Sequence, residues 1–119
     1  MSGWIGVDLD GTLARYEHWQ GPAHIGEPVQ PMLDRVKGWL KEGREVRIFT
    51  ARVTYTPERQ QEHAVARLAI QAWCEEHIGQ KLEITNVKDF DMIELWDDRC
   101  VQVQPNAGIP VVEFWRHSL

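Results

Sequence analysis

The sequence has few of the features that mark secreted, disulfide-rich or membrane-spanning proteins. It contains only two cysteines, Cys74 and Cys100, which lie far apart and form no CxxC pair. We therefore expect reduced, structural cysteines rather than a disulfide framework. No apolar run approaches the roughly 20 residues that a membrane span needs. The N-terminus lacks a basic region followed by an apolar stretch, so we expect a cytoplasmic protein without a membrane partner.

Positive charge is also scarce. The 13 Lys and Arg residues are outnumbered by 18 Asp and Glu residues, and the formal net charge is −5. Proteins that hold a polyanion usually carry a basic stripe, and this sequence has none. We therefore expect no extended nucleic-acid surface, which leaves room for a local basic pocket around one phosphate group. The sequence also lacks GxxxxGK[ST], and this excludes a P-loop nucleotide-binding protein.

Short apolar runs predict the strands of one α/β domain that covers residues 1–119. The first run ends abruptly at Asp8, as expected for a buried strand whose tip carries a functional group. The runs lie at 4–7, 45–50, 82–85, 92–96 and 101–103, with a further edge strand predicted at 109–115.

Two stretches with helical spacing alternate with these runs. The first begins at Pro31 and ends before Gly43, and the second begins at Thr56-Pro57 and closes near Gly79. The apolar residues at helical spacing in the first are Met32, Leu33, Val36, Trp39 and Leu40. This alternation predicts a single Rossmann-like, three-layer domain, with a mostly parallel sheet of five or six strands and helices on both faces. The predicted buried stripe of the second helix is Ala64, Val65, Leu68, Ala69 and Ala72.

Residues suited to phosphate chemistry follow the predicted strands. Ligands of open α/β sheets bind beyond the carboxyl ends of the strands, so these residues are expected on one rim. Clustered carboxylates repel one another unless a cation joins them, and hard oxygen ligands suit Mg²⁺. A carboxylate can then attack phosphorus, while a hydroxyl and an amine donate to the phosphate oxygens. The residues are Asp8, Asp10, Thr50, Lys88, Asp97 and Asp98.

Four segments resemble, in order, the four motifs of the haloacid dehalogenase-like (HAD) phosphohydrolase superfamily. They are DLDGTL at 8–13, FTAR at 49–52, Lys88, and WDDR at 96–99. The resemblance implies a magnesium-dependent phosphatase that works through an aspartyl-phosphate. The intervals between the motifs are too short for a cap domain. The chain is therefore similar to the small uncapped members, which include uncharacterised phage and bacterial proteins.

The resemblance also implies how the four aspartates act. Asp8 would be the nucleophile and a direct Mg²⁺ ligand. Asp10 would protonate the leaving oxygen and then activate water, and its backbone carbonyl would touch the metal. Asp97 would bind Mg²⁺ directly, and Asp98 would be either a second ligand or act through water.

The phosphate group itself would be held by residues of the first three motifs. Thr50 and its neighbour Ala51 would hold the phosphoryl group, and Lys88 would neutralise both this group and the nucleophile. Gly11 relieves the steric limit on the turn after the first motif's aspartates, so backbone amides there can face an anion. For the nearby Arg52, as for Arg99, we expect local salt bridges rather than contact with substrate.

The segment from Gly11 to Gln30 is rich in Gly, Pro, His and aromatic residues, and we interpret it as an ordered flap. Its aromatics could pack the flap onto the sheet, which is the interpretation we favour. Alternatively, Trp19 stacks a base or another flat group, with His18 or Arg15 reaching a second polar feature. The residues in question are Arg15, Tyr16, His18, Trp19 and His24.

Two alternatives to a phosphatase differ in class. One is a binding or regulatory domain that keeps the metal site but has little or no turnover. The other is a phosphoacceptor receiver domain, which is disfavoured because the middle strand ends in Thr50 rather than in an acid. For a phosphatase, the substrate could be a small phosphorylated molecule or a phosphorylated macromolecule end.

Overall fold

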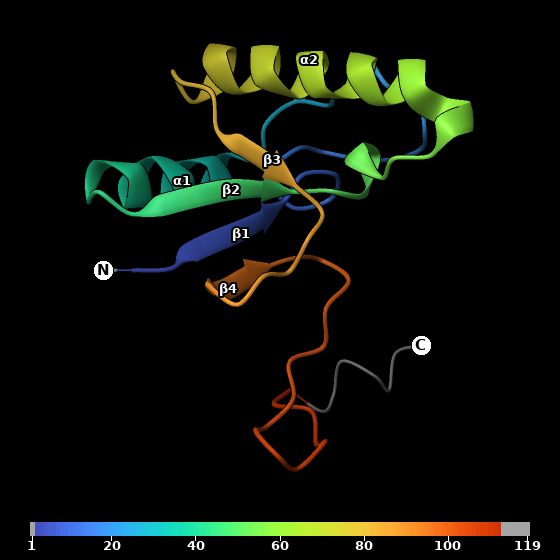
Figure 1. Cartoon of the computed structure of the whole chain (residues 1–119). Coiled ribbons are helices and arrows are strands. Elements are labelled where there is room, and N and C mark those ends of the chain that lie inside the picture. The colour runs from blue at the N-terminus through green and yellow to red at the C-terminus, as the bar shows by residue number, and fades with distance from the viewer. Residues whose placement is uncertain (1, 113–119) are drawn as a thin grey trace.

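The computed structural model of the chain describes residues 2–112. Two 3₁₀ turns, Ala51–Val53 and Pro57–Arg59, lie between the second strand and the second helix. No helix within residues 2–112 is long and apolar enough to cross a bilayer. The helices and strands, in chain order, are β1 (Trp4–Asp8), α1 (Gln30–Lys41), β2 (Glu45–Phe49), α2 (Gln60–His77), β3 (Glu83–Thr85) and β4 (Met92–Trp96) (Figure 1).

The strands form one sheet in the order β3-β2-β1-β4, and every neighbouring pair is parallel. Asp8 is level with Phe49, and Phe49 is level with Thr85. Because all four strands run in the same direction, their carboxyl ends meet at one edge of the sheet. The α/β class and the parallel sheet are therefore confirmed.

The prediction of five or six strands is wrong for residues 2–112. Val103 forms only an isolated bridge with Pro110, in a small hairpin that extends away from the sheet (Figure 1). Backbone hydrogen bonds form within the hairpin, where the Gln104 amide donates to the Ile109 carbonyl at 2.8 Å. Pro110 also lacks the N–H that a ladder needs. Residues 113–115 of the predicted edge strand lie outside the described part of the chain.

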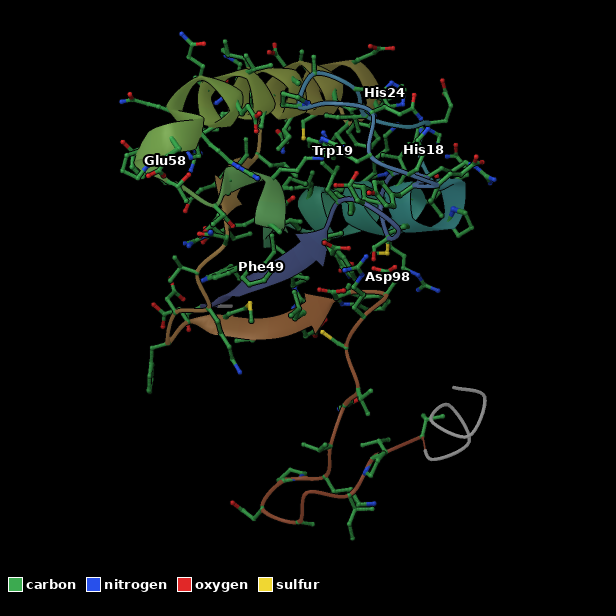
Figure 2. The ribbon with its side chains drawn as sticks, turned by 90° about the vertical axis from the view of Figure 1, so that its right-hand side faces the viewer. His18, Trp19, His24, Phe49, Glu58 and Asp98 are labelled. Atoms are coloured by element: carbon green, nitrogen blue, oxygen red, sulfur yellow. The ribbon has the colours of Figure 1, made fainter. Side chains whose placement is uncertain are left out.

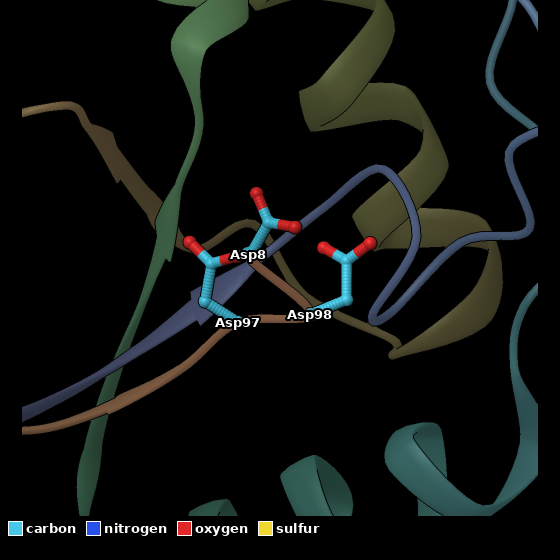
Figure 3. Close-up of side chains that lie close together, drawn as sticks. All are labelled: Asp8, Asp97 and Asp98. Carbon is cyan, nitrogen blue, oxygen red and sulfur yellow. The ribbon is translucent and has the colours of Figure 1, made fainter. Parts of the chain in front are cut away.

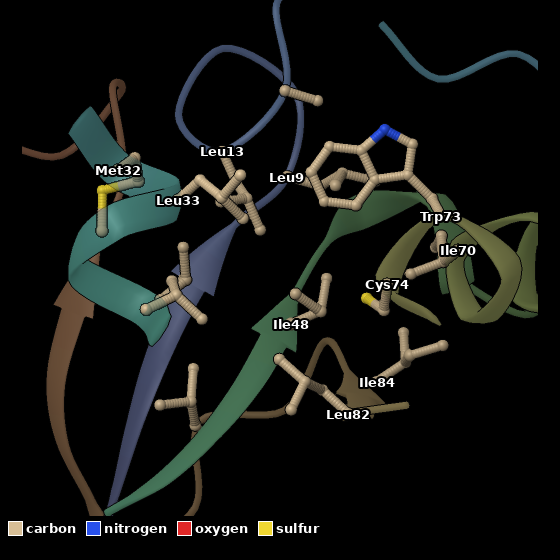
Figure 4. Packing of buried hydrophobic residues seen from close by; sticks show 14 of the residues in the cluster. Leu9, Leu13, Met32, Leu33, Ile48, Ile70, Trp73, Cys74, Leu82 and Ile84 are labelled. Atoms are coloured by element: carbon tan, nitrogen blue, oxygen red, sulfur yellow. The ribbon is translucent and has the colours of Figure 1, made fainter. Parts of the chain in front are cut away.

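The prediction of helices on both faces of the sheet is also wrong for the part of the chain that the structure describes. The inward-pointing residues of β1 and β2, such as Val7 and Ile48, pack in one cluster with buried residues of both helices (Figure 4). The steps from β1 to β2 and from β2 to β3 move across the sheet in the same direction. Right-handed crossovers therefore place both helices on the same face. The β3–β4 connection at 86–91 contains no helix, so residues 2–112 form two layers rather than three.

The face without helices is covered by side chains of the sheet itself. Trp4 is only 1% exposed, although it alternates with the inward-facing Ile5. The Arg47 guanidinium lies 4.4 Å from the centre of the Trp4 ring, and the Trp4 indole N–H donates to Asp89 at 2.8 Å. This cation–π contact and hydrogen bond bury the ring and satisfy its polar atom.

The two helices differ in how well their buried faces were predicted. In α1, Met32, Leu33 and Val36 are buried, as the helical spacing predicts. In α2 the predicted stripe is wrong, because Leu68 is 68% exposed and Val65 is 40% exposed. The buried residues of α2 include larger groups than the alanines of that stripe, and the Trp73 indole N–H also donates to the Gly26 carbonyl at 2.9 Å. The buried residues of α2 are Ala66, Ile70, Trp73 and Cys74.

Candidate active site

Three carboxylates meet at the edge where the strands end. Asp8 is the last residue of β1, and Asp97 and Asp98 directly follow β4. Because β1 and β4 are neighbours in the sheet, residues 90 positions apart lie side by side (Figure 3). One carboxylate oxygen from each residue lies within 4.8 Å of those from the other two. The structure thus brings together the three side chains that the sequence assigned to metal binding.

The electrostatics of this cluster favour a cation. Burial and, to a smaller extent, the negative charges of Asp97 and Asp98 together raise the pKa of Asp8 to about 7, although a hydrogen bond from Thr12 acts in the opposite direction. A divalent cation would remove the repulsion that opposes ionisation of Asp8. Three converging carboxylate oxygens are also the hard donor set that Mg²⁺ takes. The described residues therefore fit the predicted ion.

Thr12 joins two of these carboxylates and was missed as a functional residue. Its hydroxyl lies 3.2 Å from an oxygen of Asp8 and 3.4 Å from one of Asp98, and it accepts a hydrogen bond from the Asp98 amide at 3.0 Å. A hydroxyl has one proton, so it can donate to only one carboxylate at a time. Its position two residues after Asp10, in the DGT segment, was the signal that could have identified it.

Gly11 is required by the space around it. Its φ of +90° is strained for residues with a side chain, and an added Cβ would collide with the Asp98 carboxylate. The Gly11 amide donates to the Ala14 carbonyl at 2.8 Å. It is therefore already used within the turn. That backbone amides of this turn face an anion stays a prediction.

Asp10 is held by an arginine. Arg52 donates to both carboxylate oxygens of Asp10, at 2.7 and 2.9 Å. The Arg52 side chain is only 5% exposed, so this bidentate pair is shielded from water and fixes the orientation of the carboxylate. The same guanidinium lies 4.9 Å from the centre of the Trp19 ring and donates to the Pro22 carbonyl at 3.4 Å. The predicted local salt bridge of Arg52 is thus confirmed.

Thr50 is buried at the end of β2, with 2% of its surface exposed. Its amide donates to the Thr85 carbonyl at 2.9 Å, which fixes its backbone against β3. Its hydroxyl oxygen accepts from the Arg52 amide at 3.2 Å and caps the 3₁₀ turn that Ala51 begins. The bond from Arg52 does not use the hydroxyl proton, and Thr50 lines the cavity described below.

These residues line one cavity of about 810 Å³. Asp8, Asp10, Asp97 and Asp98 line it together with Thr50 and Ala51. Lys88 and Gly11 do not, and Lys88 is exposed. Lys88 lies in the connection from β3 to β4, where Asn86 lines the cavity instead. The sequence predicts the order of the motif residues along the chain, but it does not predict which side chain of this short connection reaches the cavity.

The flap forms one wall of the cavity through Tyr16, Trp19 and Pro22. Figure 2 looks onto this edge of the sheet and shows Trp19 on the flap and Asp98 after β4. Trp19 is 52% exposed and Tyr16 is 40% exposed, so these two aromatics are not buried between the flap and the sheet. The buried Leu13 and Ala14 anchor the flap in the core, and the Arg15 amide donates to the Glu27 carbonyl at 2.8 Å. Arg15, His18 and His24 are likewise exposed.

Comparison with known proteins adds information about the fold. A scan against protein-family models finds no match, and a search of curated proteins also finds none. Among solved structures, a conserved protein coded by a locus of Bacteroides thetaiotaomicron is similar. It aligns with a TM-score of 0.56 and 18% sequence identity, over 89% of this chain and 84% of that chain. At this identity the similarity shows a shared α/β fold and assigns no function.

Proposed function

We propose that this chain is a magnesium-dependent phosphohydrolase that transfers the phosphoryl group of a monoester to Asp8 and then to water. The observation that supports this most strongly is the meeting of Asp8, Asp97 and Asp98 beside a cavity that also contains Asp10 and Thr50. The resemblance of the motif order to HAD phosphohydrolases supports the same assignment. Asp8, Asp97 and Asp98 would hold the ion.

In the first step, an Asp8 carboxylate oxygen would attack phosphorus. The new P–O bond makes an aspartyl-phosphate, and the bond from phosphorus to the leaving oxygen breaks. A bound Mg²⁺ would supply positive charge that lets an anionic nucleophile meet an anionic ester. The Thr50 hydroxyl proton would donate to a phosphate oxygen as charge spreads in the transition state.

Asp10 would manage the protons in both steps. As general acid it would protonate the leaving oxygen, and as general base it would take a proton from the water that attacks the aspartyl-phosphate. That attack releases inorganic phosphate and restores Asp8. The bidentate pair with Arg52 fixes the position of the Asp10 carboxylate. The first step requires Asp10 to carry a proton, so we expect the Arg52 pair to loosen when substrate binds.

The dependence on metal tests the function directly. We expect phosphate release from a panel of nucleotides, sugar phosphates, phosphopeptides and p-nitrophenyl phosphate to require Mg²⁺. Excess EDTA should lower the rate by about 100-fold or more, because the repulsion among three carboxylates then returns. The measurement is the initial rate of phosphate release with and without chelator, restored by added Mg²⁺. An unchanged rate in EDTA would contradict the assignment of Asp97 and Asp98.

Replacing Asp10 by Asn tests the proton transfer. Asn cannot donate a carboxyl proton, so Asp10→Asn should slow esters of poor leaving groups by about 10²-fold or more. The loss should be smaller for p-nitrophenyl phosphate, whose leaving group needs little protonation. The readout is the ratio of kcat/KM for an alkyl phosphate and for p-nitrophenyl phosphate, in the wild type and in the variant. Equal losses for both esters would count against Asp10 as the general acid.

A second candidate function is a metal-binding domain with little turnover. The observation that favours it is the position of Lys88, which does not line the cavity although the motif order assigns it to the phosphate. In that case Mg²⁺ would bind and stabilise the fold, but no ester of the panel would release phosphate above the rate of an Asp8→Asn control. Stabilisation by Mg²⁺ and phosphate release relative to the Asp8→Asn control, measured together, distinguish the two candidate functions.

A further inference from the structure

The cavity is much larger than a phosphate group. Its volume of about 810 Å³ falls in the upper part of the range of roughly 300–1,000 Å³ that is usual for sites of drug-sized ligands. The carboxylates, Thr50 and Ala51 occupy one part of its lining. The flap and the region around the start of α2 line the rest. The cavity therefore has room for the alcohol portion of a phosphate ester as well as for the phosphate.

Trp19 lies beside the reacting groups, although it belongs to the flap. Arg52 connects the two, because it donates a hydrogen bond to Asp10 at 2.7 Å and its guanidinium lies 4.9 Å from the centre of the Trp19 ring. Arg52 is itself almost fully buried, so it gives the ring a fixed support. Trp19 nevertheless keeps 52% of its surface exposed and lines the cavity. An indole that Arg52 supports and that is half exposed beside Asp10 is suited to stack a flat group carried by the leaving alcohol.

The part of the cavity near α2 is polar. Thr54, Arg59, His63 and Asn86 line it, and the Asn86 amide lies 3.4 Å from the Thr54 hydroxyl. Amide, hydroxyl and imidazole groups both donate and accept hydrogen bonds, as the edge of a nucleobase does. If the alcohol portion of the ester were an extended apolar chain, these polar groups would have no hydrogen-bond partner on the substrate.

We propose that the site takes a nucleoside monophosphate, with its base stacked on Trp19. Hydrolysis of the nucleotide rests on the proposed function. Binding of the nucleotide does not. A free nucleotide suits the site better than a polynucleotide end, because five carboxylates line the cavity and the chain carries a net charge of −5. A neighbouring phosphodiester would add further repulsion.

The test compares substrates that differ only in the base. Adenosine 5′-monophosphate and uridine 5′-monophosphate are compared with ribose 5-phosphate by kcat/KM, in the wild type and in Trp19→Ala, Trp19→Phe and Phe90→Ala. We expect the wild type to prefer the nucleotides by about tenfold or more, and Trp19→Ala to lose most of this preference. Trp19→Phe should retain part of it. Phe90→Ala is the matched control, because it also removes an exposed aromatic side chain, but one that lies outside the cavity.

A binding measurement separates this inference from the reaction. Calorimetric titration of the Asp8→Asn variant with the same three compounds measures affinity without turnover. Hydrolysis without base preference, or with a preference that Trp19→Ala leaves intact, would overturn the nucleotide assignment and leave the phosphatase standing. Nucleotide binding that depends on Trp19, without hydrolysis by the wild type, would support the ligand and reject the reaction. Neither binding nor hydrolysis would reject both. A 5′-phosphorylated oligonucleotide is titrated in the same way, and a preference for it over the two nucleotides would overturn the choice of a free nucleotide.

Discussion

Replacing Asp8 by Asn is expected to reduce phosphate release to the background rate, a loss of about 10³-fold or more. The carboxylate oxygen of Asp8 is the proposed nucleophile, and an amide oxygen cannot form the acyl phosphate. Asn has nearly the same shape as Asp, so the partly buried position at the end of β1 should stay filled. The measurement is the initial rate with the best ester of the panel, together with a circular dichroism spectrum to verify folding.

The matched control for this variant is Asp98→Asn. Asp98 belongs to the same carboxylate cluster but is exposed, and it cannot replace Asp8 as the attacking group. It should therefore lose less activity, and added Mg²⁺ should recover part of the loss. Acid-quenched wild type should also carry a hydroxylamine-sensitive phosphoryl group that Asp8→Asn lacks. If Asp8→Asn kept more than a tenth of the wild-type rate, Asp8 would not be the nucleophile.

Without divalent cation, the wild type is expected to lose stability as the pH rises from about 4 to about 7. The pKa of Asp8 is raised from its ordinary value of 3.8 to about 7 by burial and by the neighbouring charges of Asp97 and Asp98. The folded protein therefore keeps a proton that the unfolded chain releases. The favourable contribution is complete below pH 3.8 and is lost as the pH passes about 7. Asp8→Asn has no such group, so at pH 8 it should be more stable than the wild type by about 1–2 kcal/mol, since Asp8 is partly exposed and screened.

With saturating Mg²⁺, the wild type should instead be more stable than Asp8→Asn. Binding to the folded state alone adds about 2.7 kcal/mol at a hundredfold excess over Kd, and Asp8→Asn has lost one of the ligands. Urea unfolding of both proteins at pH 4 and pH 8, with and without Mg²⁺, gives the four differences in the free energy of unfolding. A wild type that is more stable than Asp8→Asn at pH 8 in EDTA would show that the carboxylates do not repel one another as described.

The sequence predicted the parts of this protein that depend on local pattern. The apolar run before Asp8 predicted a buried strand and the run before Asp97 predicted a second strand, and parallel pairing then required their ends to meet. The helical spacing of Met32, Leu33 and Val36 likewise identified the buried face of α1. These predictions were correct because one physical rule, the burial of apolar side chains, determines each of them.

Features that depend on the arrangement of distant segments were harder to predict. The second layer of helices was expected from alternation alone, but residues 86–91 contain no helix to form it. The apolar stripe through Leu68 competed with one through Ile70 and Trp73, and the larger buried area of the second decided the orientation of α2. Periodicity alone could not rank the two stripes.

The site shows the same division. The carboxylates follow from strand ends, whereas the bond between Asp10 and Arg52 joins two loops whose approach no spacing reveals. The sequence analysis predicted a local salt bridge for Arg52 but did not identify Asp10 as its partner. The exposed position of Trp19 also differs from the packing that the flap's composition favoured, because the Arg52 guanidinium rather than the sheet supports the ring.

The most direct measurement is a crystal structure of the protein soaked in Mn²⁺ as a substitute for Mg²⁺, with anomalous difference density recorded. One peak should lie at about 2.0–2.3 Å from carboxylate oxygens of both Asp8 and Asp97. Absence of a peak there, at a concentration that stabilises the protein, or a peak bound elsewhere with these two carboxylates turned apart, would contradict the shared cation.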